Sequence, residues 1–179
     1  MEQIRYTQRI CGDKNKINNF LEDKRVGALS MCDEYGNPYV IPVNYIYLNE
    51  KIYIHGMGSG KKNRIIETKP SVCFTVFEEF GTVVDIVPCK CDTSYFSIVI
   101  MGKMFLVKDI NEKTQVLTKL VEKFMPNFFK NPLSNQFVEK YKSSFDKMPV
   151  SVYCLSPEIL TAKENPIDME HMFKNMKQI

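Results

Sequence analysis

The sequence predicts a mainly β protein, specifically a small, largely antiparallel barrel with helices packed on its outside. Three observations predict this class. Short runs of β-branched and aromatic residues follow one another with turns between them, a short helix follows the third run, and another strand returns near the end of the chain. Strands and helices do not alternate as they would in a doubly wound parallel sheet. A small antiparallel barrel fits this order better.

The first half of the chain is predicted to contain two helices and four strands. Asp13 has the position of an N-cap for a helix that runs to about Lys24, with Ile17 and Leu21 on its apolar face. Strands are predicted over 26–32, 38–48, 51–56 and 71–80, and the sequences DEYGN and LNEK form turns between the first three. A short cationic helix lies between the third and fourth strands and ends before Pro70.

The second half is predicted to add two strands and further helices. The stretch 81–93 has mixed signals and receives no assignment. A long strand covers 95–108, where Gly102 indicates a bulge or a close approach of two backbones. Asp109 and Glu112 have capping-box spacing ahead of the next helix. A helical piece around 134–145, a last strand over 149–160 and a helical tail from about residue 164 complete the prediction.

Length and composition suggest what kind of protein this is. We expect a single domain over 1–179, because domains of about 100 to 200 residues are common. The net charge of +3 comes from basic residues interleaved with acids, which argues against nucleic acid as a partner. No apolar stretch approaches the roughly 20 residues that span a membrane. The polar N-terminus lacks a secretion signal, so we expect a cytoplasmic protein.

Cysteine and histidine give little support to a metal site. The six cysteines contain no CxxC pair, and the two histidines are His55 and His171. Cys89 and Cys91 form the one close pair and are interpreted as loop thiols. The sequence therefore predicts no metal site.

The segment HGMGSGKKNR, residues 55–64, is the strongest candidate for chemistry. Lys61, Lys62 and Arg64 would lie on the first turn of a helix, where the macrodipole is already positive. The glycine spacing fits neither a Walker P-loop nor a dinucleotide fingerprint. Free N–H groups and two lysines after a Gly-Ser segment could nevertheless hold a monophosphate. A solvated cationic face is the alternative reading.

Three motifs occur in a familiar order: GNPYVIPVNY, then IYIHG followed by GKK, then SVCFTV. With them the chain resembles, over about residues 15 to 125, the flavin-binding split-barrel proteins related to pyridoxamine 5′-phosphate oxidase. Within that family it is most similar to the nitroimidazole-resistance group. The resemblance implies a six-stranded antiparallel split barrel with flanking helices. It also implies a homodimer that binds FMN in the groove between its subunits.

The resemblance also implies roles for particular residues. The strand after Gly-x-Pro would run under the flavin ring, which concerns Ile41, Pro42, Val43, Asn44 and Tyr45. The end of the next strand and the basic pair after it would bind the phosphate, at His55, Gly56, Lys61 and Lys62. Ser97 would place a polar group near the ring. Taken alone, these residues could also be ordinary strand residues, a half-buried histidine and surface lysines.

Two departures from the family pattern limit what the resemblance implies. Phe96 stands where relatives often have a basic residue. The C-terminal region also lacks the Arg-x-His pattern with which pyridoxamine phosphate oxidases bind the vitamin. That particular oxidase activity is therefore not predicted.

Two function classes remain open. The first is an FMN-dependent reductase that passes electrons from a reduced donor such as NAD(P)H to a small, flat, electron-poor acceptor such as a nitro-aromatic. His55 would then be the catalytic residue, because the unperturbed pKa of histidine lies near neutrality. The second is a non-catalytic flavin store, sensor or electron-transfer module, because the chain offers no convincing acid–base pair beyond His55. A barrel that holds haem is a third, weaker possibility.

Overall fold

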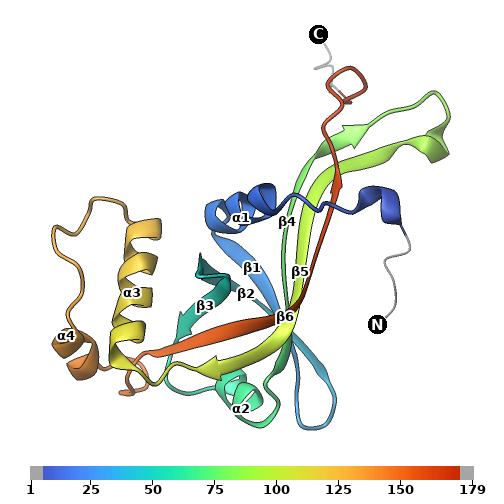
Figure 1. The fold of residues 1–179 in the computed structure, drawn as a ribbon. Coiled ribbons are helices and arrows are strands. Elements are labelled where there is room, and N and C mark those ends of the chain that lie inside the picture. The colour runs from blue at the N-terminus through green and yellow to red at the C-terminus, as the bar shows by residue number, and fades with distance from the viewer. Residues whose placement is uncertain (1–5, 174–179) are drawn as a thin grey trace.

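A computed structural model of the protein describes residues 6–173, and six strands form its centre (Figure 1). The strands are β1 Val26–Cys32, β2 Pro38–Leu48, β3 Lys51–Gly56, β4 Ser71–Val83, β5 Asp92–Leu106 and β6 Ser151–Asn165. The helices are α1 Lys14–Asp23, α2 Lys61–Thr68, α3 Ile110–Phe124 and α4 Asn135–Lys140, and short 3-10 turns cover η1 Thr7–Arg9 and η2 Pro88–Lys90. Within 6–173, no helix has both the length and the apolar composition needed to span a membrane.

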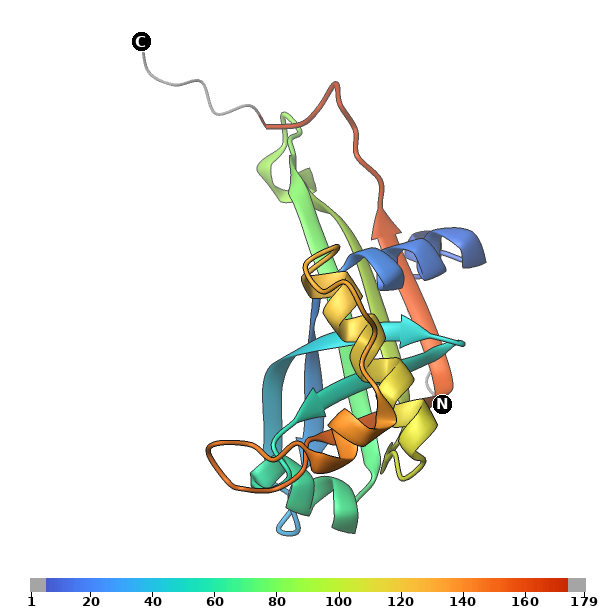
Figure 2. The same cartoon turned by 90° about the vertical axis from the view of Figure 1, so that its left-hand side faces the viewer.

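The strands form one closed antiparallel barrel (Figure 1; Figure 2). Their order around the barrel is β1-β2-β3-β6-β5-β4, and pairing of β4 with β1 closes it. The late strand β6 enters between β3 and β5. The predicted fold class, a mainly β protein with a six-stranded antiparallel barrel and flanking helices, is confirmed.

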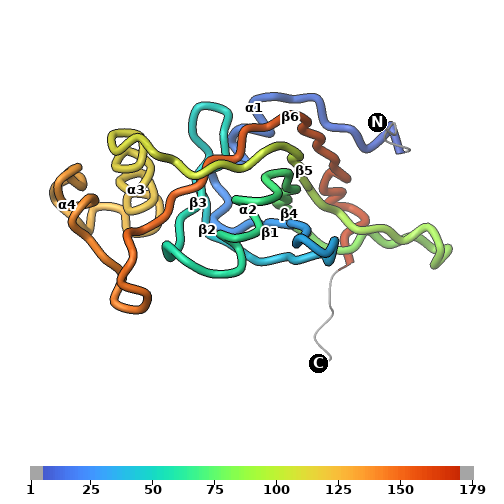
Figure 3. Tube along the Cα trace, turned by 90° about the horizontal axis from the view of Figure 1, so that it is seen from below, coloured from blue at the N-terminus to red at the C-terminus, as the bar shows by residue number. Residues whose placement is uncertain are grey.

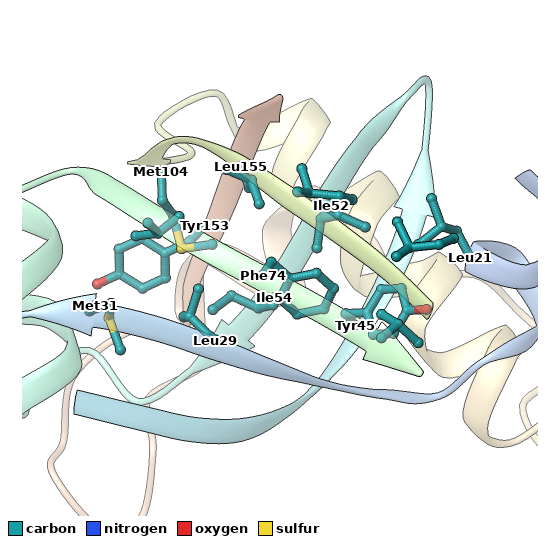
Figure 4. Close-up of a cluster of buried hydrophobic side chains, with 14 of the residues drawn as sticks. Leu21, Leu29, Met31, Tyr45, Ile52, Ile54, Phe74, Met104, Tyr153 and Leu155 are labelled. Atoms are coloured by element: carbon teal, nitrogen blue, oxygen red, sulfur yellow. The ribbon is translucent and has the colours of Figure 1, made fainter. Parts of the chain in front are cut away.

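Alternate residues of the strands point inward and fill the barrel with apolar side chains. Leu29, Phe74 and Leu155 come from three different strands and are completely buried in one cluster, which Figure 4 shows. Each such side chain contributes about 1.5–3 kcal/mol by leaving water. The interior is therefore a packed core, so a ligand must bind on the outside of the barrel.

Helix α3 covers a second, smaller apolar cluster. Its Val116 and Leu120 pack with residues of β2, β3 and β6. Asp109 caps the helix as predicted, since its Oδ1 accepts the N–H of Glu112 at 2.7 Å. The carboxylate of Glu112 is used differently from the capping-box prediction, because its Oε1 accepts the hydroxyl of Tyr53 at 2.8 Å. This bond ties the start of α3 to β3.

The unassigned stretch 81–93 belongs to an arm that β4 and β5 extend beyond the barrel (Figure 1). β4 continues to Val83 and β5 begins at Asp92, with η2 in the connection. The register shifts between Glu79 and Gly81, where Gly81 has a φ of 130° that glycine adopts readily. Sequence patterns alone miss this pairing because bulged, exposed strands lose the simple alternation of apolar residues.

Gly102 marks a close approach of two backbones, as predicted. The register between β5 and β6 shifts between Met101 and Gly102. A Cβ atom at this position would collide with the carbonyl oxygen of Ser156 on β6. Glycine is therefore required by packing at the point where the long strand bends.

The predicted helical tail from about residue 164 is wrong over 164–173. β6 continues to Asn165, and its pairing with β5 includes Glu164 opposite Phe96. The amide Nδ2 of Asn165 donates to Thr93 O at 2.8 Å, and Pro166 disfavours a helical conformation for the residue before it. Residues 174–179 of the predicted tail lie outside the described residues. The helical piece predicted around 134–145 is also shorter than expected, since α4 ends at Lys140.

Candidate functional site

The glycine-rich connection between β3 and α2 presents a helix start without a side-chain cap. Gly60 occupies the N-cap position with a φ of 126°, a conformation that favours glycine. The first backbone hydrogen bond of the helix is donated by Arg64 to Gly60 O at 3.2 Å. The N–H groups of residues 61–63 therefore lie ahead of the helical ladder, and the first turn contains no acidic residue. This geometry suits an anion.

Lys62 extends from this helix start back toward the barrel. A Cβ atom on Gly56 would collide with the Nζ of Lys62, so the missing side chain at the end of β3 makes room for the ammonium group. The same Nζ lies 5.4 Å from the ring centre of Tyr153 on β6. Burial lowers the pKa of Lys62. Among the ion pairs of residues 6–173, none includes Lys62.

Lys61 has different surroundings although it is the neighbouring residue. Its Nζ lies 3.8 Å from a carboxylate oxygen of Asp33 and 4.5 Å from the ring centre of Tyr39. Asp33 belongs to the turn between β1 and β2, where it accepts the N–H of Asn37 at 2.8 Å. The two lysines thus contact different strands. The charge of Lys61 is partly compensated, whereas Lys62 has no such partner in the described chain.

His55 lies on β3 next to Gly56, with its ring accessible to solvent. Its backbone is opposite Val152 of β6. Neighbouring protein atoms limit the solvation of the imidazole, and this desolvation, together with the nearby charge of Lys62, lowers the pKa of His55. The ring is therefore mainly neutral at pH 7 in the free protein. It can then donate one hydrogen bond and accept another.

The five predicted ring-binding residues of β2 divide between the two faces of the strand. Ile41, Val43 and Tyr45 point into the barrel, and Tyr45 is 0% exposed with its ring centre 5.1 Å from that of Phe74. Pro42 and Asn44 point outward. Side chains alternate along a strand, so consecutive residues cannot all face one ligand. Any contact of the inward residues with a ligand would have to use their backbone.

Ser97 lies on the same outer surface as the outward residues of β2. Pro42 pairs with Ala28, which pairs with Thr75 of β4, and Thr75 pairs with Val99 of β5. Ser97 lies two residues before Val99 and points to the same side. We call this surface, formed by the outward residues of β2, β1, β4 and β5, the outer sheet face. It contains a groove of about 180 Å³ lined by Val26, Gly27, Ala28, Pro42, Thr75, Val76 and Phe77.

Two groups of the site were not found by sequence reasoning. Tyr153, whose ring faces Lys62, comes from β6, and Asp33, which pairs with Lys61, comes from a turn. Pairing of β3 with β6 brings Tyr153 opposite Ile54. Nothing in the local sequence around Tyr153 indicates that contact. Only the register between strands distant in the chain creates it.

Comparison with known proteins gives a family match over most of the chain. A family model described as pyridoxamine 5′-phosphate oxidase matches residues 13–164. No curated protein matches the chain significantly.

Solved structures match the fold. The flavocytochrome Anf3 from Azotobacter vinelandii is 20% identical with a TM-score of 0.75, over 95% of this chain and 77% of that protein. A proposed 5-nitroimidazole antibiotic resistance protein from Bacteroides thetaiotaomicron is 23% identical with a TM-score of 0.65, over 86% and 85% of the two chains. An FAD- and haem-binding protein from Mycobacterium smegmatis is 15% identical with a TM-score of 0.70, over 90% and 77%. At these identities the likeness establishes the shared fold.

Proposed function

The chain belongs to the pyridoxamine 5′-phosphate oxidase family, and we propose that it is a flavoprotein that binds FMN on the outside of its barrel. The phosphate would lie at the start of α2, and the ring would extend along β2 toward the outer sheet face. Structural neighbours described as a flavocytochrome and as an FAD- and haem-binding protein support a flavin as the ligand. Because side chains alternate between the two faces of a strand, Pro42, Asn44 and Ser97 are the predicted residues whose side chains could contact the ring.

The ammonium group of Lys62, which has no carboxylate partner among residues 6–173, is the observation that carries this proposal. Without a bound anion, a partly buried cation that lacks a carboxylate partner is unfavourable, as its lowered pKa indicates. The helix dipole adds to that cost, because the cation lies on the first turn of α2. A phosphate dianion reverses both effects, since it accepts hydrogen bonds from the ammonium and from the free N–H groups.

We propose that a second copy of the chain completes the site. The outer sheet face exposes large apolar side chains, with Phe77 70% exposed and Val26 and Met101 also accessible. An apolar surface of this kind on the body of a barrel is typical of an interface. A two-fold homodimer is the usual closed assembly of one self-complementary face. Such a dimer would enclose a ring bound along β2.

The proposed activity is reduction of a small, flat, electron-poor acceptor such as a nitro-aromatic compound. The flavin would supply the redox chemistry, with NAD(P)H as the proposed electron donor. The chain's own residues would bind the phosphate through Lys62, position the ring against β2 and exclude water. His55 would donate a hydrogen bond at the accessible edge of the site through the N–H of its mainly neutral ring, and its minor protonated form would be the proton donor.

A flavin store, sensor or electron-transfer module is the second candidate. In the described part of the chain, His55 is the residue beside Lys62 whose ordinary pKa lies near neutrality, and one such group is not an acid–base pair. Rapid mixing of the flavin-loaded protein with NAD(P)H and then with a nitro-aromatic acceptor separates the two candidates. Reduction or reoxidation no faster than that of free FMN would favour the module.

The cofactor is tested by titration of the purified protein with FMN and riboflavin, which differ by the phosphate. Charge-assisted hydrogen bonds contribute about 1.5–3 kcal/mol each. We therefore expect FMN to bind at least about tenfold more tightly than riboflavin. Equal affinities would remove the phosphate site from the proposal. Absorption by a haem Soret band, in place of flavin bands, would contradict the flavin assignment itself.

A further inference from the structure

A second cavity lies between α3, α4 and the connection that joins them. Its volume is about 470 Å³, and it is lined by Thr118, Val121, Glu122, Met125, Asn127, Phe129, Lys130, Asn131, Pro132, Leu133 and Phe137. Figure 3 shows α3 and α4 at the opposite end of the molecule from the arm formed by β4 and β5. None of its lining residues belongs to β2, β3 or α2. The cavity is therefore separate from the proposed phosphate site.

The cavity uses a face of α3 that the barrel does not cover. Val116 and Leu120 of this helix are buried against the barrel. Thr118, Val121 and Glu122 lie on a different stripe of the helix, which lines the cavity together with the C-cap residue Met125. Volumes of about 300–1,000 Å³ with mainly apolar lining are typical of sites for small molecules. A helix that presents one apolar face to the core and another to a cavity is suited to such a ligand.

Aromatic rings dominate the opening of this cavity. Phe129 is 56% exposed and Phe137 is 55% exposed, although both belong to the cavity lining. The ring of Phe137 also stacks with that of Tyr141, with 6.1 Å between the ring centres. Exposed rings of this kind offer flat surfaces on which a planar molecule can stack. The lining thus favours a ligand with an aromatic body.

The charges around the cavity favour an anion. Glu122 is the acidic lining residue, and its carboxylate is 2.7 Å from the Nζ of Lys119. Lys130 is the basic lining residue, and it forms no ion pair with the part of the chain that the structure describes. The amide side chains of Asn127 and Asn131 add polar groups at the rim. The rim therefore carries one uncompensated positive charge.

We propose that this cavity is a binding site for a small aromatic molecule with one anionic group. The planar body would stack on Phe129 and Phe137 and contact Val121 and Met125. The anionic group would lie at the rim beside Lys130. This inference is independent of the proposed flavin function, because the two sites share no residue.

Two fluorescent compounds test the proposal as a matched pair. 1-Anilinonaphthalene-8-sulfonate has an aromatic body and one negative charge, and N-phenyl-1-naphthylamine is the same body without the sulfonate. Calorimetric titration uses the full chain after loading with FMN and removal of unbound FMN by gel filtration, so that the proposed flavin site is occupied and no free FMN competes for the cavity. We expect one molecule of the sulfonate to bind per chain. Phe129→Ala should weaken its binding about tenfold, whereas Phe145→Ala, at a residue that is 87% exposed and absent from the lining, should not.

The rim lysine gives a second measurement that does not depend on changing the apolar lining. Lys130→Gln should weaken binding of the sulfonate roughly two- to fivefold, as expected for an exposed ion pair, and leave the uncharged compound unchanged. Lys140→Gln on α4 is the control, since Lys140 does not line the cavity. No binding to the FMN-loaded chain, or equal losses from Phe145→Ala and Phe129→Ala, would overturn the proposal. A dimer that dissociates on Phe129→Ala would also overturn it, because a second copy would then occupy the cavity.

Discussion

Lys61 and Lys62 are adjacent in sequence but have different electrostatic surroundings. Asp33 lies 3.8 Å from the Nζ of Lys61, whereas Lys62 extends over Gly56 and Tyr153. A phosphate at the start of α2 would gain more from Lys62, because that cation has no competing carboxylate among the described ion pairs. The two residues therefore have unequal expected roles, although both were predicted to bind the phosphate.

Lys62→Ala should weaken FMN binding by about 1.5–3 kcal/mol, or roughly ten- to a hundredfold. Lys61→Ala is the matched control, and its loss should be smaller because Asp33 already partly compensates that charge. Fluorescence titration of FMN measures both variants. Thermal unfolding without FMN should show that Lys62→Ala leaves stability unchanged or higher, since the cation opposes the helix dipole. A less stable apo protein with unchanged FMN affinity would contradict the phosphate role.

Gly56→Ala tests the role of the Lys62 ammonium group without removing that group. A methyl group at this position would collide with the Nζ of Lys62 and displace it from the end of β3. We expect at least a severalfold loss of FMN affinity, with the preference for FMN over riboflavin reduced in parallel. If riboflavin loses as much affinity as FMN, the residue affects the ring and not the phosphate.

Helix α3 is held by polar contacts at both of its ends. Asp109 caps its start, and Lys123 near its end reaches the barrel. The Nζ of Lys123 donates to Lys24 O at 2.6 Å and lies 4.6 Å from the ring centre of Tyr45. Both ends of this helix therefore depend on polar contacts that isolated helix propensity does not provide.

Asp109→Ala should lower the free energy of unfolding by about 1 kcal/mol, the usual cost of losing an N-cap. The lost contact is the bond from the N–H of Glu112. Glu158→Ala serves as a control, because its carboxylate is exposed and lies 3.9 Å from Lys103 Nζ. Urea unfolding of both variants measures the difference. Equal effects would show that the cap does not stabilise α3.

Lys123 is expected to make the free energy of unfolding depend on pH in the alkaline range. Burial lowers its pKa to about 8, and the nearby charges of Asp23, Arg25 and Glu22 modify that shift. The unfolded chain has the higher pKa, so between pH 8 and about 10.4 it binds more protons than the folded protein. The contribution of Lys123 to stability therefore rises with pH across this window. The charged side chain is most unfavourable below pH 8.

We expect this rise to be absent in Lys123→Met. Urea unfolding at pH 7, 8.5 and 10 should show a smaller gain in stability with pH for the variant than for the wild type. Lys119→Met, at an exposed cation on the same helix, should keep the wild-type slope. Parallel pH profiles for wild type and Lys123→Met would rule out the lowered pKa.

At the scale of the whole molecule, the outer sheet face exposes large apolar side chains that a monomer would leave in contact with water. Phe77 and Val26 line the small groove of the outer sheet face, and Met101 is an exposed residue of the same face. Neighbouring strands β2, β1, β4 and β5 bring these residues together. The proposed homodimer would bury this surface and the bound ring at the same time.

If the chain forms the proposed homodimer, Phe77→Asp should convert it to monomers, because a charge in a closed apolar interface is strongly unfavourable. Sedimentation velocity measures the change. FMN affinity should fall together with dimerisation if the site is shared. Phe145→Asp, at a residue that is 87% exposed outside the outer sheet face, should leave the dimer intact. A wild-type monomer that binds FMN at full affinity would contradict the shared site.

The sequence by itself determined the local elements and their order. Asp13 caps α1, and the first three strands have the predicted bounds, because turn residues and alternating apolar side chains act over a few residues. The motifs around β2 and α2 were also sufficient to indicate the family that the comparison finds. These features depend on residues that are close together along the chain, so they can be predicted from the sequence.

The tertiary structure decided which of those residues can act together. It placed Tyr45 inside the barrel, separated Lys61 from Lys62 and brought Tyr153 of β6 to the end of β3. It also continued β6 to Asn165, at the start of the predicted helical tail, where the strand pairs with β5. Closure of the barrel fixes these contacts between strands that are far apart in the chain. The register between such strands cannot be predicted from a local sequence pattern.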